Sequence, residues 1–136
     1  MSGGEAKFWR NDLKFAFESM GDVDRIESHD TALGRPDVNL CLQGGVEWNI
    51  ELKYCDSNKI KLRPSQKMWL RKRARVGGKV AVFTKVVTNR GVTFYLLHVG
   101  PAVARVSDEL VDWVNTADVC WDDKINFGEL EEILRG

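Results

Sequence analysis

The chain has 136 residues, 43% of them hydrophobic and 29% charged, so we expect one globular domain with a substantial core. No stretch approaches the roughly 20 apolar residues of a membrane-spanning helix, and the N-terminal MSGGEAKFWR lacks the apolar segment of a signal peptide. Three separated cysteines and two histidines, without a C-x-x-C motif, argue against a disulfide framework and a zinc site and favour a reducing cytoplasm.

The net charge of zero hides a strong segregation of charge along the chain. Residues 53–90 hold twelve of the twenty Lys and Arg but a single acid, Asp56. Residues 106–136 hold nine acids against two basic residues, Lys124 and Arg135. This asymmetry predicts a basic surface for a polyanion and an acidic segment elsewhere. The alternative is that the Lys and Arg residues only keep a helix and a loop soluble.

The first predicted element is an amphipathic helix over residues 5–20, ended by Gly21. At 100° per residue, six apolar side chains share its inner face: Phe8, Trp9, Leu13, Phe15, Ala16 and Met20. Glu5 falls in the middle of that face, Asp12 lies near it, and Glu18 points to solvent. An inward carboxylate needs a partner, a metal ion or a cleft. A simpler role for Glu5 is a favourable interaction with the helix dipole.

Strands are expected at residues 23–29, 36–42 and 46–54, and Gln43-Gly44-Gly45 is the turn of a hairpin. After a polar loop at 55–63, a helix runs from Pro64 to about Val76. Two more strands follow at 80–87 and 92–99. Ser107 is a candidate cap for a short helix at 108–115, before a brief strand at 118–121 and a helix at 128–134. This order predicts one α/β domain, a mixed central sheet flanked by helices, with a core at about 5–100 and an acidic extension at about 106–136.

The stretch Ile50-Glu51-Leu52-Lys53-Tyr54 places Glu51 and Lys53 on one face of a predicted strand. An ordinary half-buried strand has the same pattern, with its charges in water. Asp37 opens the preceding strand, although aspartate is depleted in strands. In the predicted hairpin, Asp37 lies beside the later part of 46–54, so the three side chains cluster on one face. Two carboxylates suit Mg²⁺ or Mn²⁺, and a lysine can position water and stabilise developing negative charge.

The second helix carries two polar features. Its apolar face holds Trp69, Leu70, Ala74 and Val76, and Gln66 lies at the centre of that face. A buried glutamine with satisfied hydrogen bonds would also explain Gln66. Basic residues recur at intervals of four and form a separate stripe suited to a phosphate backbone, and they are Lys67, Arg71 and Arg75.

Pro36-Asp37, thirteen further residues and Glu51-Leu52-Lys53 resemble the signature of the PD-(D/E)XK nucleases, which have a restriction-endonuclease-like fold. The lead-in Gly34-Arg35 and the later Pro64-Ser65-Gln66 at a helix start are similar to the VRR-NUC and Holliday-junction-resolvase branch. That branch also tends to have a glutamate on its first helix, which Glu5 fits. The resemblance covers about residues 5–87.

The resemblance implies phosphodiester hydrolysis with Mg²⁺ or Mn²⁺, often by a homodimer. It implies that Asp37 and Glu51 are metal ligands, with the Leu52 carbonyl and Glu5 as further ligands. Lys53 would be the catalytic lysine, and Gln66 would support the metal ligands from behind or position the substrate. The basic residues expected to contact DNA are Lys59, Lys61, Arg63, Lys67, Arg71 and Arg75.

We therefore expect a cytoplasmic DNA endonuclease of a bacterial or phage-infected cell, acting on a junction, flap, nick or other DNA structure. The first alternative is a non-catalytic nucleic-acid-binding module on the same fold. Another is a soluble interaction domain whose charges lie only on the surface. The acidic segment could cover a sheet edge, form a dimer contact or imitate nucleic acid.

Overall fold

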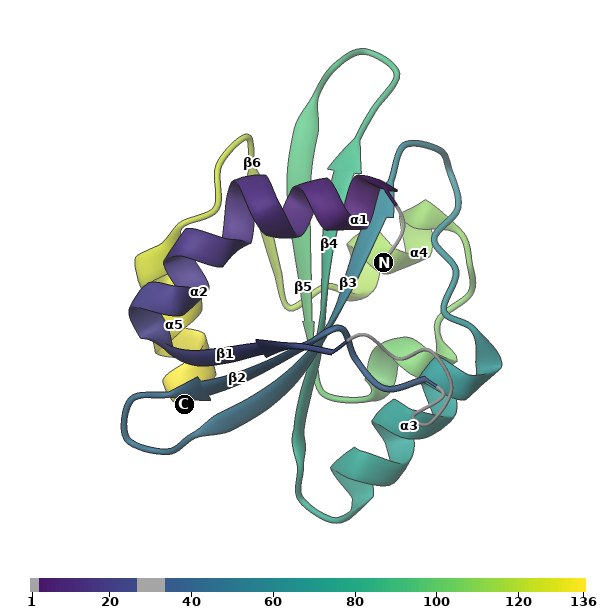
Figure 1. Ribbon diagram of the computed structural model, residues 1–136. Helices are drawn as coiled ribbons and strands as arrows, with labels where there is room; N and C mark the ends of the chain where they lie inside the picture. The colour runs from purple at the N-terminus through teal and green to yellow at the C-terminus, as the bar shows by residue number, and fades with distance from the viewer. Residues whose placement is uncertain (1–2, 27–33) are drawn as a thin grey trace.

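The computed structural model describes residues 3–26 and 34–136, which form a six-stranded sheet with helices on both faces (Figure 1). The strands lie in chain order across the sheet, and β3 and β4 are parallel while the other neighbours are antiparallel. The predicted mixed sheet flanked by helices is therefore confirmed. The elements are α1 (Gly3–Lys7), the π-helical segment η1 (Phe8–Leu13), α2 (Lys14–Met20), β1 (Gly21–Arg25), β2 (Val38–Leu42), β3 (Glu47–Cys55), α3 (Pro64–Arg75), β4 (Lys79–Val87), β5 (Thr93–Val99), the 3₁₀ segment η2 (Ala102–Arg105), α4 (Leu110–Thr116), β6 (Val119–Asp122) and α5 (Phe127–Arg135).

Two apolar clusters pack against opposite faces of the sheet. The first cluster joins the N-terminal helix and α5 to the sheet, and Leu52 of β3 belongs to it. The second joins α3, α4 and η2 to the other face. Because side chains alternate along a strand, Glu51 and Lys53 lie on this second face, below α3. No helix in the described ranges is long and apolar enough to cross a membrane.

A π-helical segment interrupts the first helix and changes which side chains face the core. Phe15 was expected on the inner face, but it is 86% exposed, and Phe17 is fully buried instead. A π-helical turn contains more residues than an α-helical turn, so every side chain after it is rotated around the axis. The regular 100° spacing therefore places Phe8, Trp9, Leu13 and Met20 correctly in the core, but it misplaces Phe15 and misses Phe17.

Several predicted boundaries also change. Gly21 begins β1 instead of only ending the helix, and its missing Cβ makes room for the Cys41 carbonyl oxygen, which would lie 2.0 Å from a Cβ. The part of the expected first strand at residues 27–29 lies outside the described residues. Val76 was expected on the apolar face of the second helix, but it follows the last turn of α3 and is 80% exposed.

The hairpin ladder between β2 and β3 stops partway along β3. Its last pair is Val38 with Ile50, whereas β3 continues to pair with β4 as far as Cys55 and Val86. In Figure 1 the far end of β3 runs away from the β1–β2 pair. The second half of β3 therefore has one backbone edge that no strand in the described parts of the chain covers.

The acidic segment 106–136 contributes to both layers and to the sheet. β6 pairs with β5, and α5 packs on the first cluster, where the Trp48 indole N–H donates to the Leu134 carbonyl at 2.7 Å. Asn126 caps α5 by accepting a hydrogen bond from the Glu129 N–H. Ser107 does not cap α4 as expected: Glu109 is the cap residue, and the Ser107 hydroxyl accepts from the Glu109 N–H.

Phe17→Ala should destabilise the fold by roughly 3–5 kcal/mol, because it empties a fully buried aromatic site. Phe15→Ala, two positions away and largely exposed, is the matched control and should change stability by less than about 0.5 kcal/mol. Urea denaturation measures both variants. Equal losses would contradict the altered helix phase.

Candidate active site

The site begins where β2 and β3 separate. Asp37, the residue before β2, accepts a hydrogen bond from the Leu52 N–H group to its Oδ2 at 3.0 Å. The carboxylate thus replaces the strand that would otherwise bond this edge of β3. The expected placement of Asp37 beside the later part of the second hairpin strand is confirmed by this contact. The N–H and C=O groups of one strand residue point to the same edge, so the Leu52 carbonyl faces this gap too.

Glu51 and Lys53 flank Leu52 on the α3 side of the sheet, and both are buried, with 2% and 9% of their surface exposed. Their charges are therefore not directed into bulk water, as they would be in an ordinary half-buried strand. A buried charge is costly unless it is paired and hydrogen-bonded. The two side chains accordingly require partners from the helix above them.

Gln66 supplies those partners. Its Oε1 accepts hydrogen bonds from the Lys53 Nζ at 3.1 Å and from the Arg63 N–H at 2.8 Å, and its Nε2 donates to the Glu51 Oε2 at 3.2 Å. The bond from Arg63 closes the first turn of α3, so the amide orientation is set by the start of the helix. Gln66 is a buried glutamine with satisfied hydrogen bonds, and its partners are the two candidate catalytic side chains.

The lead-in to Asp37 packs directly on the start of α3. Gly34 has φ of +81°, and a Cβ there would lie 2.1 Å from the Ser65 carbonyl oxygen. Only glycine has both the conformation and the space that this contact requires. The loop that carries Asp37 is thus packed against the same helical turn that carries Gln66.

The electrostatics of Glu51 favour a bound cation. Burial and then the negative charge of Asp37 raise the pKa of Glu51 well above its usual value, while Lys53 lowers it. The Glu51 Oε1 atom is buried without a hydrogen-bond partner among the described residues. A carboxylate oxygen with no donor, close to a second carboxylate, fits a hard divalent cation that binds oxygen.

Glu5 is half-buried at the start of the N-terminal helix, and its charge also raises the pKa of Glu51, as the weakest of the causes. Its charge therefore acts on the site, although more weakly than that of Asp37. In the ranges 3–26 and 34–136, however, no three Asp, Glu, His or Cys side chains gather tightly enough to hold one ion. Direct ligands would then be Asp37, Glu51 and the Leu52 carbonyl, and Mg²⁺ commonly keeps several waters in such a site.

Asp12, which the sequence placed near the inner face beside Glu5, has a different role. Its carboxylate pairs with Lys85 at 2.6 Å and lies 3.5 Å from the Tyr95 hydroxyl. Burial acts to lower the pKa of Lys85, but the hydrogen bond and charge of Asp12 outweigh it, and the pKa is raised. This pair joins the helix to β4 and β5 on the first face of the sheet.

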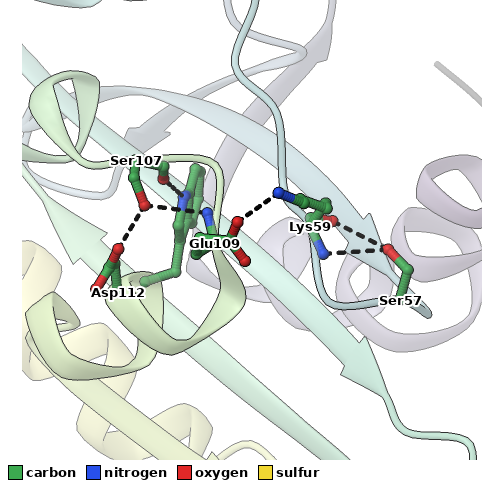
Figure 2. Close-up of polar contacts among 6 residues, drawn as sticks. Ser57, Lys59, Ser107, Glu109 and Asp112 are labelled. Atoms are coloured by element: carbon green, nitrogen blue, oxygen red, sulfur yellow. Dashed lines mark hydrogen bonds and ion pairs between the residues drawn. The ribbon is translucent and has the colours of Figure 1, made fainter.

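The predicted DNA-binding residues are not equivalent. Lys59 forms an ion pair with Glu109 (Figure 2), and backbone hydrogen bonds on both sides of this pair join the β3–α3 loop to the start of α4. Lys61 and Arg63 are exposed. On α3, Lys67 is half-buried, while Arg71 and Arg75 are exposed.

Two residues that the sequence patterns did not single out, Asn39 and Asn49, continue the polar face. The Asn39 side chain in β2 donates to the Asn49 side chain in β3 at 3.2 Å, and Asn49 is 7% exposed. Each lies two positions from a candidate ligand, Asp37 or Glu51, and therefore on the same face of the sheet. Their spacing of two residues from Asp37 and Glu51 was the sequence feature that could have identified them.

No family model matches this sequence, and no curated protein matches it either. Among solved structures, it is similar to Hjc from Archaeoglobus fulgidus, a Holliday junction resolvase from an archaeal hyperthermophile. The TM-score is 0.50, and the alignment covers 95% of this chain and 98% of that chain at 13% sequence identity. This likeness shows that the chain has a resolvase-like fold, the restriction-endonuclease-like architecture expected from the sequence.

Glu51→Gln should raise the melting temperature of the metal-free protein near neutral pH. In the unfolded chain Glu51 ionises near its ordinary pKa of about 4.3, but in the fold it ionises at higher pH. Its contribution to stability is therefore greatest below the ordinary pKa, falls as the pH rises through the folded pKa, and is constant above it. Thermal melts in EDTA across this range measure the difference between the two proteins.

Added Mg²⁺ or Mn²⁺ should raise the melting temperature of the wild type and have little effect on Glu51→Gln. Glu47→Gln, on the same strand but exposed, is the control and should behave as the wild type in both conditions. A Glu51→Gln variant with the wild-type pH profile and metal response would contradict the assignment of Glu51 as a metal ligand.

Proposed function

We propose that this protein is a metal-dependent DNA endonuclease that hydrolyses phosphodiester bonds in structured DNA. The observation that carries the proposal is the assembly of Asp37, Glu51 and Lys53 at the uncovered edge of β3, with Gln66 joining Lys53 to Glu51. A buried ion pair that only stabilises the fold does not need a second carboxylate, such as Asp37, beside it. It also does not need an acceptor oxygen without a donor, such as the Glu51 Oε1 atom.

The residues have distinct roles in this proposal. Asp37, Glu51 and the Leu52 carbonyl hold a Mg²⁺ or Mn²⁺ ion, with Glu5 as an accessory ligand through water. When bound, the ion lowers the pKa of water and neutralises phosphate charge. Lys53 positions the attacking water and stabilises the negative charge that develops on the phosphate. Gln66 holds the Lys53 ammonium in place.

A non-catalytic binding module on this fold remains the alternative, and the buried Lys53–Gln66–Glu51 network favours the enzyme over it. Binding through the basic helix alone would not require buried charges below that helix. The similar fold of a Holliday junction resolvase favours branched DNA as the substrate class. The resemblance in sequence also favours a homodimer, in which two sites act on one branched molecule.

The deciding experiment is cleavage of end-labelled four-way junctions, flaps, nicked duplexes and linear duplexes with Mg²⁺ or Mn²⁺. We expect cleavage of at least one branched DNA with either metal and none in EDTA. Binding of these DNAs without cleavage under any metal condition would support the alternative module.

Asp37→Asn should abolish cleavage, because it removes a metal-binding charge, while DNA binding persists. Lys53→Ala should lower kcat by at least about a hundredfold and leave metal-dependent thermal stabilisation in place. Single-turnover cleavage measures the rates. The control is Glu18→Gln, an exposed acid on the first helix, which should cleave at the wild-type rate. Near wild-type cleavage by both site variants would place the chemistry elsewhere.

The exposed stripe on α3 should contact phosphates. We expect the double variant Arg71→Ala, Arg75→Ala to weaken binding to every DNA and to flatten the salt dependence by at most about two units. The melting temperature should hardly change, because exposed charges contribute little to stability. Arg10→Ala with Lys14→Ala, an exposed pair on the first helix, is the matched control for lost positive charge. A salt slope equal in all three proteins would exclude the stripe from the DNA contact.

A further inference from the structure

A second polar surface lies on the other side of α3 from the stripe of Arg71 and Arg75. It is a groove between the first half of β3 and the end of α3, and its polar lining residues are Arg35, Asn39, Glu47, Asn49, Arg73 and Lys79. At 100° per residue, Arg73 is nearly in phase with Gln66, two turns earlier, and lies on the side of the helix away from the stripe. The groove is therefore distinct from the surface that the basic stripe forms.

The floor of the groove lies on the same face of the sheet as the candidate active site. Asn49 precedes Glu51 by two residues and Asn39 follows Asp37 by two, so all four side chains lie on one face of β2 and β3. The Asn39 amide donates to the Asn49 Oδ1, and the Asn49 Nδ2 group has no hydrogen-bond partner among the described residues. Neutral amide donors are suited to the oxygens of a phosphate or sugar.

Two cations at the wall of this groove are held by aromatic rings. The Arg73 guanidinium lies 4.4 Å from the Trp69 ring centroid, and the Lys79 ammonium lies 5.5 Å from that of Trp48. Stacking restricts a long side chain before a ligand arrives, which lowers the entropy lost on binding. Within the described ranges, no carboxylate forms an ion pair with Arg35, Arg73 or Lys79.

Charge and length fit a nucleic-acid strand. Three cations face a single acid, Glu47, at the start of β3. From Glu47 to Glu51 the strand is roughly 13 Å long, and from Gln66 to Arg73 the helix rises roughly 10 Å. This span is long enough for two consecutive phosphates of one strand.

We propose that this groove binds the DNA strand on one side of the scissile phosphate, with Arg73, Lys79 and Arg35 on its phosphates and the Asn39–Asn49 pair beneath it. The inference rests on the proposed function for the position of the scissile phosphate, which lies at Asp37 and Glu51. The surface itself is a DNA-binding site independently of cleavage. Glu47 weakens binding in this groove because its charge repels phosphate.

The test removes positive charges from the groove in one variant and the negative charge in another. Arg73→Gln with Lys79→Gln keeps a polar side chain at both positions and removes two positive charges. Glu47→Gln removes the negative one. Fluorescence anisotropy with a labelled flap DNA in EDTA measures Kd over a range of salt concentrations, and thermal melts check that each variant is folded. Arg10→Gln with Lys14→Gln is the control of equal charge change.

We expect the groove double variant to lose affinity at least about tenfold and to flatten the salt slope by one to two units. Glu47→Gln should bind more tightly than the wild type, and the control double variant should bind as the wild type does within about twofold. A groove double variant that matches the control pair, or a Glu47→Gln variant that binds more weakly, would overturn the proposal.

The same flap DNA with single methylphosphonates, which lack the phosphate charge, tests the position of the strand. Neutral positions on one side of the cleavage point should weaken the wild type but not the groove double variant. Loss of binding in the groove variants with no cleavage by any protein would refute the proposed endonuclease and retain the groove. Metal-dependent cleavage with unaltered binding in the groove variants would support the proposed endonuclease and refute the proposed groove.

Discussion

The hydrogen bond from the Leu52 N–H group to the Asp37 carboxylate lies where the β2–β3 ladder stops, and the candidate site depends on it. Buried backbone donors need partners, and here a side chain provides what the next strand residue would have provided. That substitution holds an anion at the free edge of β3, next to Glu51. The Gly34 contact with the start of α3 then couples this edge to Gln66. The separation of β2 from β3, the Asp37 and Glu51 carboxylates and the start of α3 are thus structurally coupled.

This arrangement is electrostatically unfavourable for the protein without a ligand. Two carboxylates approach each other, and Glu51 is buried with one oxygen lacking a donor. Lys53 and Gln66 offset part of this cost, but the raised pKa of Glu51 shows that the offset is incomplete. Binding sites that are costly when empty gain affinity for the ligand that removes the cost. The surrounding elements, β3 and α3, contribute buried side chains to the two apolar clusters, which hold the site residues in position.

The segregated charge of the chain has two different structural outcomes. The acidic segment 106–136 is folded into the domain, where β6 extends the sheet and α4 and α5 pack on opposite faces. Its one ion pair with the predicted DNA-binding residues in the described ranges joins Glu109 to Lys59 (Figure 2). The basic residues of α3 are divided between the stripe and the groove, on two sides of the same helix. Positive charge suited to a polyanion therefore lies on both sides of the candidate catalytic face.

Much of the site could be predicted from the sequence, because strand alternation is a local property. The alternation placed Glu51 and Lys53 on one face, and the predicted hairpin placed Asp37 beside them. The spacing from Pro64 placed Gln66 in the first turn of a helix. Tertiary structure decided the rest. After the π-helical segment, Phe17 is buried in place of Phe15. Asp12 forms an ion pair with Lys85 and is therefore not a candidate ligand. The packing of α3 on the sheet determines that Gln66 bonds to Lys53 and Glu51. Periodicity specifies the direction of a side chain from its own backbone, whereas contacts between distant segments depend on where strands separate and how helices cross them.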